Sequence, residues 1–570
     1  MATDDKTRRT GDSRDVPDTP YANGLVDPNV FAGVDPKQAL TAVKELLAQS
    51  AKHPGLLARH QFAFAQELVK ALTGTSEFEP LKGDRRFADP SFAKNPFFLA
   101  WMQSYLAWQR ELDAWVDDVG LDNKNTERAR FFVSLITDAL APTNFLLGNP
   151  SALRKAFETK GMSVVQGVRH MAEDIVGNAG LPAQVDKSAF TVGENLATTP
   201  GAVVFRNPVL ELIQYAPTTK QVRERPLIMV PPQINKFYVY DISPGKSLID
   251  YAVRSGFQVF AVSWFNPTPE QRDWSLETYL KALEEGIDAA RDITGSEDVN
   301  ILGACSGGMT VATLLGSFSA RGIEKVNSLS LLVSVLDTAE TDDTLLGLFT
   351  TKETVQAAKL ASQSKGVLEG RDLARVFAWL RPNDLVWNYW VSNYLHGNEP
   401  PAFDILYWNN DTTRLPAGLH GEFMDIALDN ALATPGKLVI GGTPIDLRNV
   451  KCDVFATGGL TDHITPWKAC YASCKLMGGH VDFVLSSSGH IQSIINPPGN
   501  PKARFYTNAN AADTADAFVE GATEHKESWW DYWRNWLEER SGGLKPAPKA
   551  LGNRKHPAGE KAPGTYVLSR

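Results

Sequence analysis

Apolar runs of strand length alternate with amphipathic helical segments from about residue 225 onward. Arg225–Pro232, Phe257–Trp264 and Val326–Leu336 are runs of the kind that form buried strands. Ser275–Ile293 lies between the last two and has apolar residues at helical spacing, with one face made by Leu276, Leu280, Leu283, Ile287 and Ala290. Strands that alternate with helices predict a parallel sheet covered by helices on both faces.

The residues before this region have helical patterns from Pro36 to about Gly180. The clearest helix is Pro96–Val119, because Asn95 can cap it and proline suits the first helical position. Residues 1–28 are polar and charged, without the apolar segment of a signal peptide, so we expect a disordered tail there. The expected organisation is this tail, a mainly helical N-terminal domain (29–195) and an α/β domain (196–570).

A cysteine flanked by glycines at two positions on either side is the clearest chemical signal: Gly303, Cys305 and Gly307. An apolar run leads into it and a helical segment, Met309–Arg321, follows. This arrangement is typical of the nucleophile elbow of the α/β-hydrolase fold, where a sharp turn presents the reactive side chain. Composition alone predicts about 0.02 such matches in this chain. Free N–H groups at the helix start favour a thiolate. The alternative is a small buried cysteine at a glycine-rich strand end.

Two further residues provide the acid and the base that a nucleophilic thiol needs. In α/β hydrolases the chain order is nucleophile, acid, histidine, and Asp462 and His490 follow Cys305 in that order. Each comes after a short apolar, strand-like run, with a predicted helix, Trp467–Met477, between them. Loops at the carboxyl ends of parallel strands collect reactive groups. We therefore expect Cys305, Asp462 and His490 to form a catalytic triad, with His463 as the rival base.

The loop Pro231–Lys236 follows the first strand, where this fold takes one oxyanion donor. Prolines cannot donate, so the candidate donors are the backbone N–H of Gln233 or Ile234, together with that of Ser306.

A segment of over a hundred residues, about 338–449, separates the strand after the elbow from the strand before Asp462. A crossover needs only one helix and a short loop, so this length predicts an ordered insertion. It contains the aromatic residues Trp379, Trp387, Tyr389, Trp390, Tyr394, Tyr407 and Trp408. We expect a lid over the catalytic edge, and an aromatic lid favours an apolar acyl substrate shielded from water. A purely structural insertion is the alternative.

Composition indicates an ordinary soluble enzyme of 570 residues, 43% of them hydrophobic. The net charge of −9 argues against a general nucleic-acid binder. The sequence contains no run of 18 apolar residues, so we expect no membrane-spanning helix. The four cysteines form no paired framework, which fits a reducing cytoplasm. Metal-ligand spacings, a P-loop and a dinucleotide fingerprint are missing from the sequence, so we expect no cofactor and no metal.

These motifs together give the chain a resemblance to the polyhydroxyalkanoate synthases, the polymerases of bacterial storage polyester. The motifs that carry it are Leu302–Gly308, Val230–Tyr238, Gly459–Trp467, Ser488–Ser493 and Ser528–Trp533. Ala304, Ser306 and the segments Leu406–Pro416 and Asn500–Phe505 resemble the class II branch, which includes pseudomonad enzymes that act on medium-chain (R)-3-hydroxyacyl-CoA. The resemblance covers nearly the whole chain.

The resemblance implies polymerisation of (R)-3-hydroxyacyl-CoA into polyester with release of CoA, through a thioester on Cys305. It implies that the CoA thioester is a substrate and not a cofactor, and that the enzyme works as a homodimer on cytoplasmic polyester granules. It also implies that Asp462 activates the substrate 3-hydroxyl, besides or instead of orienting His490. Two alternatives stay open: a thioesterase or esterase with water as acceptor, and a non-catalytic granule-coat protein.

Overall fold

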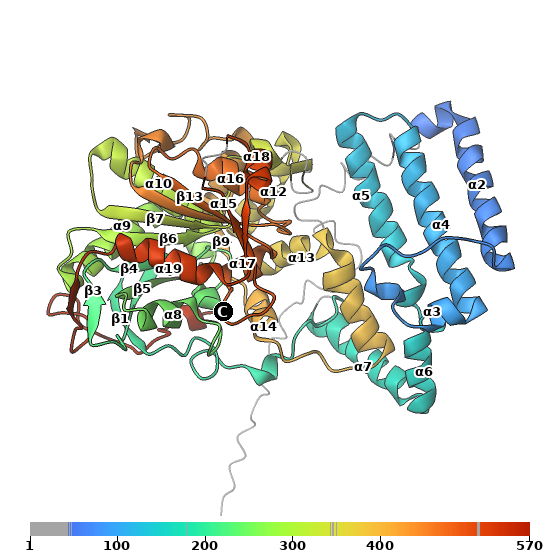
Figure 1. Ribbon diagram of the computed structural model, residues 1–570, viewed down its shortest axis with the longest axis horizontal. Helices are drawn as coiled ribbons and strands as arrows, with labels where there is room; N and C mark the ends of the chain where they lie inside the picture. The colour runs from blue at the N-terminus through green and yellow to red at the C-terminus, as the bar shows by residue number, and fades with distance from the viewer. Residues whose placement is uncertain are drawn as a thin grey trace, which may run out of the picture.

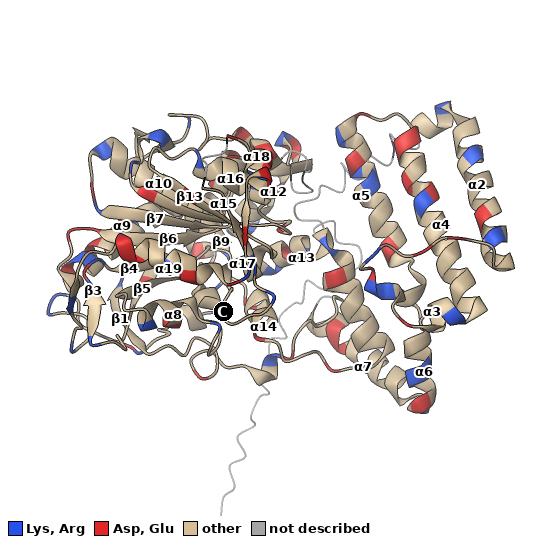
Figure 2. Ribbon diagram, viewed as in Figure 1, with Lys and Arg blue, Asp and Glu red and all other residues tan. Residues whose placement is uncertain are grey.

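The computed structural model describes residues 44, 46, 48–178, 180–341, 344, 347–348, 350–509 and 513–570 (Figure 1). The tail predicted for residues 1–28 lies outside the described residues. A helical region and a region built on a large sheet lie side by side (Figure 1). Figure 2 shows charged residues of both signs spread over both regions. Within the described ranges, no helix is both long and apolar enough to cross a membrane.

The helical region precedes the sheet in the chain. Its helices are α2 (Pro54–Thr73), α3 (Ser91–Lys94), α4 (Pro96–Asp118), α5 (Asn123–Ala139), α6 (Pro150–Glu158) and α7 (Met162–Gly177). Helices α2, α4 and α5 pack side by side (Figure 1). Helix α4 begins as the sequence predicts, because Asn95 Oδ1 accepts a hydrogen bond of 2.9 Å from the N–H of Phe97. Such a cap stabilises a helix by about 1 kcal/mol.

The second region is built on a ten-stranded sheet with the order β1-β2-β5-β4-β6-β7-β12-β13-β14-β15. The strands are β1 (Gly201–Arg206), β2 (Leu210–Tyr215), β4 (Leu227–Val230), β5 (Val259–Trp264), β6 (Val299–Ala304), β7 (Val326–Leu332), β12 (Asp453–Gly459), β13 (Val481–Ser486), β14 (Phe505–Thr507) and β15 (Thr523–His525). Short pairs outside it are β3 (Gln221–Arg223) with β16 (Leu544–Pro546), β8 (Val367–Leu368) with β9 (Leu415–Pro416), and β10 (Val439–Ile440) with β11 (Thr443–Pro444).

The six central strands, from β5 to β13 in the sheet order, are parallel as predicted. The strands at both edges, which the sequence analysis did not identify, pair antiparallel, so the sheet as a whole is mixed. Only residues 207–209 join β1 to β2. A parallel pair would need a crossover of a dozen or more residues, whereas an antiparallel pair needs only a turn.

Alternate residues of the central strands enter two separate cores. In β5, Phe260 and Val262 pack on one face, with α9 (Leu276–Thr294), α10 (Ser306–Arg321) and α16 (Trp467–Cys474). Val259 and Ala261 pack on the other face, with α8 (Leu248–Arg254) and the tryptophans of α19 (Trp529–Glu539). This two-residue alternation is that of a strand buried on both sides. The predicted double covering of the sheet is confirmed.

The segment between β7 and β12 folds mainly into helices. They are α12 (Lys352–Lys365), α13 (Gly370–Leu380), two π-helical turns (Asn383–Trp387 and Trp390–Leu395), α14 (Asp404–Asn410) and α15 (Ala417–Asp429). Figure 1 shows α13 and α14 between the sheet and the N-terminal helices. The remaining helices of the second region, α17 (His490–Ile494) and α18 (Ala515–Glu520), follow β13 and β14.

Candidate active site

Cys305 stands at the turn between β6 and α10, and its backbone is strained. Its φ of 49° and ψ of −122° lie in a region that residues with a side chain rarely adopt. A Cβ on Gly303 would lie 2.7 Å from the Cα of Gly308, and one on Gly307 would lie 2.5 Å from the carbonyl oxygen of Pro231. Any side chain at these glycines would push strand and helix apart. The structure thus has the steric arrangement that the Gly-x-Cys-x-Gly motif predicts.

Asp462 and His490 come together at the same edge of the sheet. His490 Nδ1 lies 2.7 Å from Asp462 Oδ2, and both residues are buried. The other carboxylate oxygen, Oδ1, accepts hydrogen bonds from the backbone N–H groups of Ile464 at 2.8 Å and Thr465 at 3.0 Å. With its acceptors engaged in this way, Asp462 fixes the orientation of the imidazole ring.

Thr465 holds this pair in place, a role that sequence analysis missed. Its hydroxyl donates to Asp462 Oδ2 at 2.8 Å and lies 2.9 Å from His490 Nδ1. Thr465 belongs to the Gly459–Trp467 motif, but its place between the two side chains depends on the path of the loop after β12. Nothing in the residue type alone distinguishes it from a helix-capping threonine.

The electrostatics of the site favour a protonated imidazole. Burial alone would lower the pKa of His490, but the charge and hydrogen bond of Asp462, with a side-chain hydrogen bond to Cys305, raise it to about 10. Burial opposes ionisation of Asp462, but the charge of His490 and the hydrogen bonds from His490 and Thr465 lower the pKa of its carboxyl group. An imidazole in this setting can accept the thiol proton and hold it beside a sulfur anion.

His463, the rival base, lies at the same cavity but has a different environment. Neither of its ring nitrogens has a hydrogen-bond partner among the described residues. Burial, followed by the positive charge of Arg381, lowers the pKa of His463. The ring therefore stays neutral, and no carboxylate in the described part of the chain orients it.

The three oxyanion candidates lie beside Cys305. The N–H of Ser306 is the first of α10, one of the groups that a helix leaves without an intrahelical partner. Ile234 lines the cavity together with Cys305. The N–H of Gln233 donates instead to Ser306 Oγ at 3.3 Å, and the side chain of Gln233 donates to Thr310 Oγ1 at 2.8 Å. Their role as donors stays a prediction.

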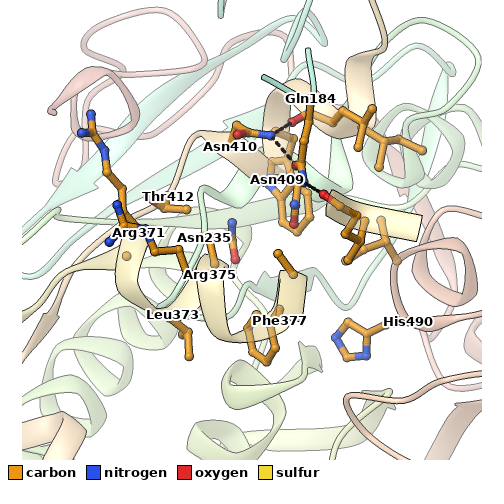
Figure 3. A pocket seen from close by; sticks show the side chains of 18 of the residues that line it. Gln184, Asn235, Arg371, Leu373, Arg375, Phe377, Asn409, Asn410, Thr412 and His490 are labelled. Atoms are coloured by element: carbon orange, nitrogen blue, oxygen red, sulfur yellow. Dashed lines mark hydrogen bonds between the residues drawn. The ribbon is translucent and has the colours of Figure 1, made fainter. Parts of the chain in front are cut away.

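Cys305, His463 and His490 line a cavity of about 390 Å³. This is the volume of a pocket for a small organic ligand. Figure 3 shows His490 on one side of this cavity. Its apolar lining includes Leu373, Ala374, Phe377, Ile405, Leu406, Trp408, Ile464 and Ile491. Most of these residues belong to the 338–449 insertion, which therefore encloses the cavity.

The aromatic residues of the insertion do not take the place that the sequence suggested. Of the seven, only Trp408 is part of the cavity lining. Trp390 Nε1 donates to the carbonyl oxygen of Asn144 at 3.1 Å, and the Tyr394 hydroxyl donates to Asp174 at 2.8 Å. The expectation of an aromatic lid over the thiol is therefore wrong for the six that do not line the cavity. The polar atoms of Trp390 and Tyr394 have hydrogen-bond partners on the N-terminal helical region, whereas Trp379 Nε1 and Trp387 Nε1 are buried without one among the described residues.

Two tryptophans of α19 fix the short helix that carries His490. Trp529 Nε1 donates to the carbonyl oxygen of Ser493 at 2.9 Å, and Trp530 Nε1 donates to that of Ile494 at 3.1 Å. These carbonyls end α17 and would otherwise lack helical partners. The motif Ser528–Trp533 thus holds in place the helix α17, which begins at His490. Within the described residues, no group of three or more His, Cys, Asp or Glu side chains could hold a metal ion.

Known proteins match this chain along most of its length. Residues 226–497 match the family described as "alpha/beta hydrolase fold", which confirms the predicted fold class. Residues 83–252 match "Poly-beta-hydroxybutyrate polymerase (PhaC) N-terminus".

Three relatives show how far the likeness extends. "Poly(3-hydroxyalkanoate) polymerase 1" of Ectopseudomonas oleovorans is 53% identical over 542 residues, which cover 95% of this chain and 96% of that protein. "Poly(3-hydroxyalkanoate) polymerase 2" of the same organism is 48% identical over 543 residues, with the same coverage. "Poly(3-hydroxyalkanoate) polymerase subunit PhaC" of Cupriavidus necator is 42% identical over 494 residues, 85% of this chain and 83% of that one. With such identity over almost its full length, the chain belongs to the poly(3-hydroxyalkanoate) polymerase family.

Proposed function

We propose that this protein polymerises medium-chain (R)-3-hydroxyacyl-CoA into polyhydroxyalkanoate through a covalent thioester on Cys305. The observation that carries the proposal is the Cys305–His490–Asp462 arrangement, in which Cys305 and His490 line a cavity with apolar and polar side chains. Membership in the polymerase family indicates the overall reaction, the formation of a polyester from hydroxyacyl units. The chemical steps follow from the positions of Cys305, His490 and Asp462.

His490 takes the proton of the Cys305 thiol, and the thiolate attacks the carbonyl carbon of the CoA thioester. The carbon–sulfur bond to CoA then breaks, and the proton on His490 passes to the departing CoA sulfur. The acyl group is now a thioester of Cys305, which keeps its acylating power because one thioester has replaced another. The 3-hydroxyl of a second hydroxyacyl group attacks this thioester and gives its proton to His490. The carbon–sulfur bond to Cys305 then breaks, the ester bond is formed, and His490 returns the proton to the Cys305 sulfur.

Asp462 orients His490 and stabilises the imidazolium. The Asp462 side chain is fully buried and lies 2.7 Å from His490 Nδ1. A carboxylate without exposed surface can orient His490 but is poorly placed to contact the substrate hydroxyl, which supports orientation as its role. Ser306 and Ile234 are the N–H donors that we propose for the oxyanion, since the N–H of Gln233 is engaged with Ser306 Oγ.

The apolar lining of the cavity supports a substrate with an alkyl chain of medium length. The alternative function is that of a thioesterase or esterase, in which water takes the place of the 3-hydroxyl as the acceptor.

One assay distinguishes the two functions. Thiol release is followed with (R)-3-hydroxybutyryl-CoA and (R)-3-hydroxydecanoyl-CoA, and the products are inspected for polymer. We expect insoluble polyester with both, formed faster from the longer substrate. Free hydroxy acid without polymer would favour the thioesterase. Faster reaction with the shorter substrate would contradict the medium-chain preference, and no CoA release at all would leave only the granule-coat protein.

We also propose that the protein works as a homodimer at the surface of cytoplasmic polyester granules. Helix α7 supports the granule contact, because an apolar stripe runs along it. Its residues Met162, Val165, Val168, Ile175 and Val176 have exposed fractions of 53–84%. Exposed apolar stripes of this extent mark interaction surfaces. Val176 also lines the cavity that contains Cys305, so the stripe begins where the polyester forms.

The double variant Val165→Ser/Val168→Ser should bind granules more weakly while it keeps thiol release on short incubation. We expect its granule–buffer partition coefficient to fall at least about 10-fold, because each valine contributes about 1.5 kcal/mol when fully buried. Sedimentation of the enzyme with purified polyester granules measures this. The control is Val439→Ser/Val519→Ser, which changes two exposed valines outside α7. An equal loss in both variants would contradict a specific role of α7.

A further inference from the structure

The lining of the cavity that contains Cys305 combines apolar side chains with neutral polar ones, such as Gln184, Asn235 and Asn410, and with a group of cations. The cationic residues in its lining are Lys187, Arg371, Arg375 and Arg381. Arg381 pairs with Asp384, and Arg375 lies 3.8 Å from Asp372. Lys187 and Arg371 have no ion-pair partner in the part of the chain that the structure describes.

These two unpaired cations act on each other. Burial and then the charge of Arg371 lower the pKa of Lys187, and the charge of Arg570 adds to this. Asp411 opposes the shift, but its carboxylate already accepts a hydrogen bond of 2.8 Å from the Tyr238 hydroxyl. Among the described residues, the cavity lining contains four cations and one carboxylate, that of Asp384, so positive charge is in excess there, and an anion bound between Lys187 and Arg371 would relieve their repulsion.

The start of α13 lies at the same place. Gly370 and Arg371 are its first two residues, and both line the cavity. A Cβ on Gly370 would lie 2.3 Å from the carbonyl oxygen of Thr413, so this helix end packs directly against the chain beside it. The Glu369 carboxylate before the helix lies 3.2 Å from Arg414 Nε and is neutralised by it. The first turn also contains Asp372, whose carboxylate is paired with Lys365 and Arg375. The N–H groups of this turn add to the positive potential.

Among these cations, Arg371 lies away from His490, whereas Arg381 is close enough to His463 to add to the lowering of its pKa by burial. Figure 3 shows Arg371 across the pocket from His490. In an acyl-CoA the thioester is at one end of the pantetheine arm and the phosphates are at the other. A substrate with its carbonyl carbon at Cys305 and its arm along the cavity would therefore bring its phosphates to this side.

We propose that Lys187 and Arg371, with the N-terminus of α13, form the binding subsite for the phosphate groups of the CoA thioester. This inference rests on the proposed function, in that a CoA thioester is the substrate. Lys187 follows the N-terminal helices, whereas Arg371 belongs to the insertion. The helical region therefore contributes directly to substrate binding.

The test compares two thioesters of the same (R)-3-hydroxydecanoyl group, one with CoA and one with pantetheine, which has no phosphate. Initial thiol release is measured for Lys187→Gln, Arg371→Gln and the control Lys281→Gln, an exposed lysine on α9. We expect each pocket variant to raise KM for the CoA thioester about 10-fold, equivalent to about 1.4 kcal/mol. With the pantetheine thioester, kcat/KM should stay within about 2-fold of the wild-type value.

Two results would overturn the subsite. One is an unchanged KM for the CoA thioester in both pocket variants. The other is an equal loss on both thioesters, which would mean that the residues support the fold or the acyl group. Calorimetry with free CoA tests the same variants without turnover. If the wild-type chain releases CoA but makes no polymer, the proposed polymerase fails while the phosphate subsite stands.

Discussion

Cys305→Ala should abolish thiol release from (R)-3-hydroxyacyl-CoA, with a fall in kcat of about 10⁴-fold or more. The remaining groups can orient a thioester and polarise its carbonyl, but the described site offers no other nucleophile beside His490. Alanine keeps a Cβ, so it fits the turn at φ 49° with the same steric demands as cysteine. A loss of activity in this variant would therefore result from the missing thiol and not from a misfolded turn. A dye that reacts with released CoA measures the rate, and intact mass measurement detects the acyl adduct on the wild-type chain.

Cys452→Ala is the matched control. Cys452 lies outside the cavity lining, and burial raises the pKa of its thiol to about 12, so it stays protonated and unreactive near neutral pH. We expect this variant to keep wild-type thiol release and the acyl adduct. Substantial turnover by Cys305→Ala, or an adduct that persists in it, would mean that the turn between β6 and α10 does not carry the nucleophile.

The sequence predicted the parts of this protein that depend on local steric rules. The elbow around Cys305 follows from glycines that the turn requires, and the start of α4 follows from Asn95 and Pro96. The positions of Asp462 and His490 follow from the chain order of the fold and from strands that end at a common edge. In each case a short stretch of residues contains the whole physical reason.

Features that depend on long-range packing could not be predicted in this way. Trp390 and Tyr394 were expected above the thiol, yet their polar atoms bond to Asn144 and Asp174, more than 200 residues away in the chain. The closeness of Lys187 to Arg371 likewise depends on how the helical region meets the insertion. The antiparallel edge at β14 depends on its pairing with β13, which the residues of neither strand specify alone.

His490→Gln should reduce thiol release by about 10³-fold or more, whereas His463→Gln should reduce it by less than about 10-fold. Both histidines lie at the cavity, and glutamine is a similar change in each, so each variant is the control for the other. His490 Nδ1 lies 2.7 Å from Asp462 Oδ2, and the ring is also hydrogen-bonded to Cys305, so that the pKa of His490 is raised. His463 has no hydrogen-bond partner among the described residues, and its pKa is lowered. The measurement is kcat for thiol release, and a larger loss in His463→Gln would mean that His463 is the base.

Asp462→Asn then separates the two roles of the acid. If Asp462 only orients His490 and stabilises its protonated form, the first turnover should already be slow. His490 would then be a weaker base for the thiol proton, because no carboxylate stabilises the imidazolium. The burst of CoA in a rapid-mix experiment measures that step. If the burst remained at wild-type rate while chain growth stopped, Asp462 would act on the incoming 3-hydroxyl. We expect loss of the burst, because the Asp462 side chain is fully buried and its Oδ2 lies within hydrogen-bonding distance of both His490 Nδ1 and Thr465 Oγ1.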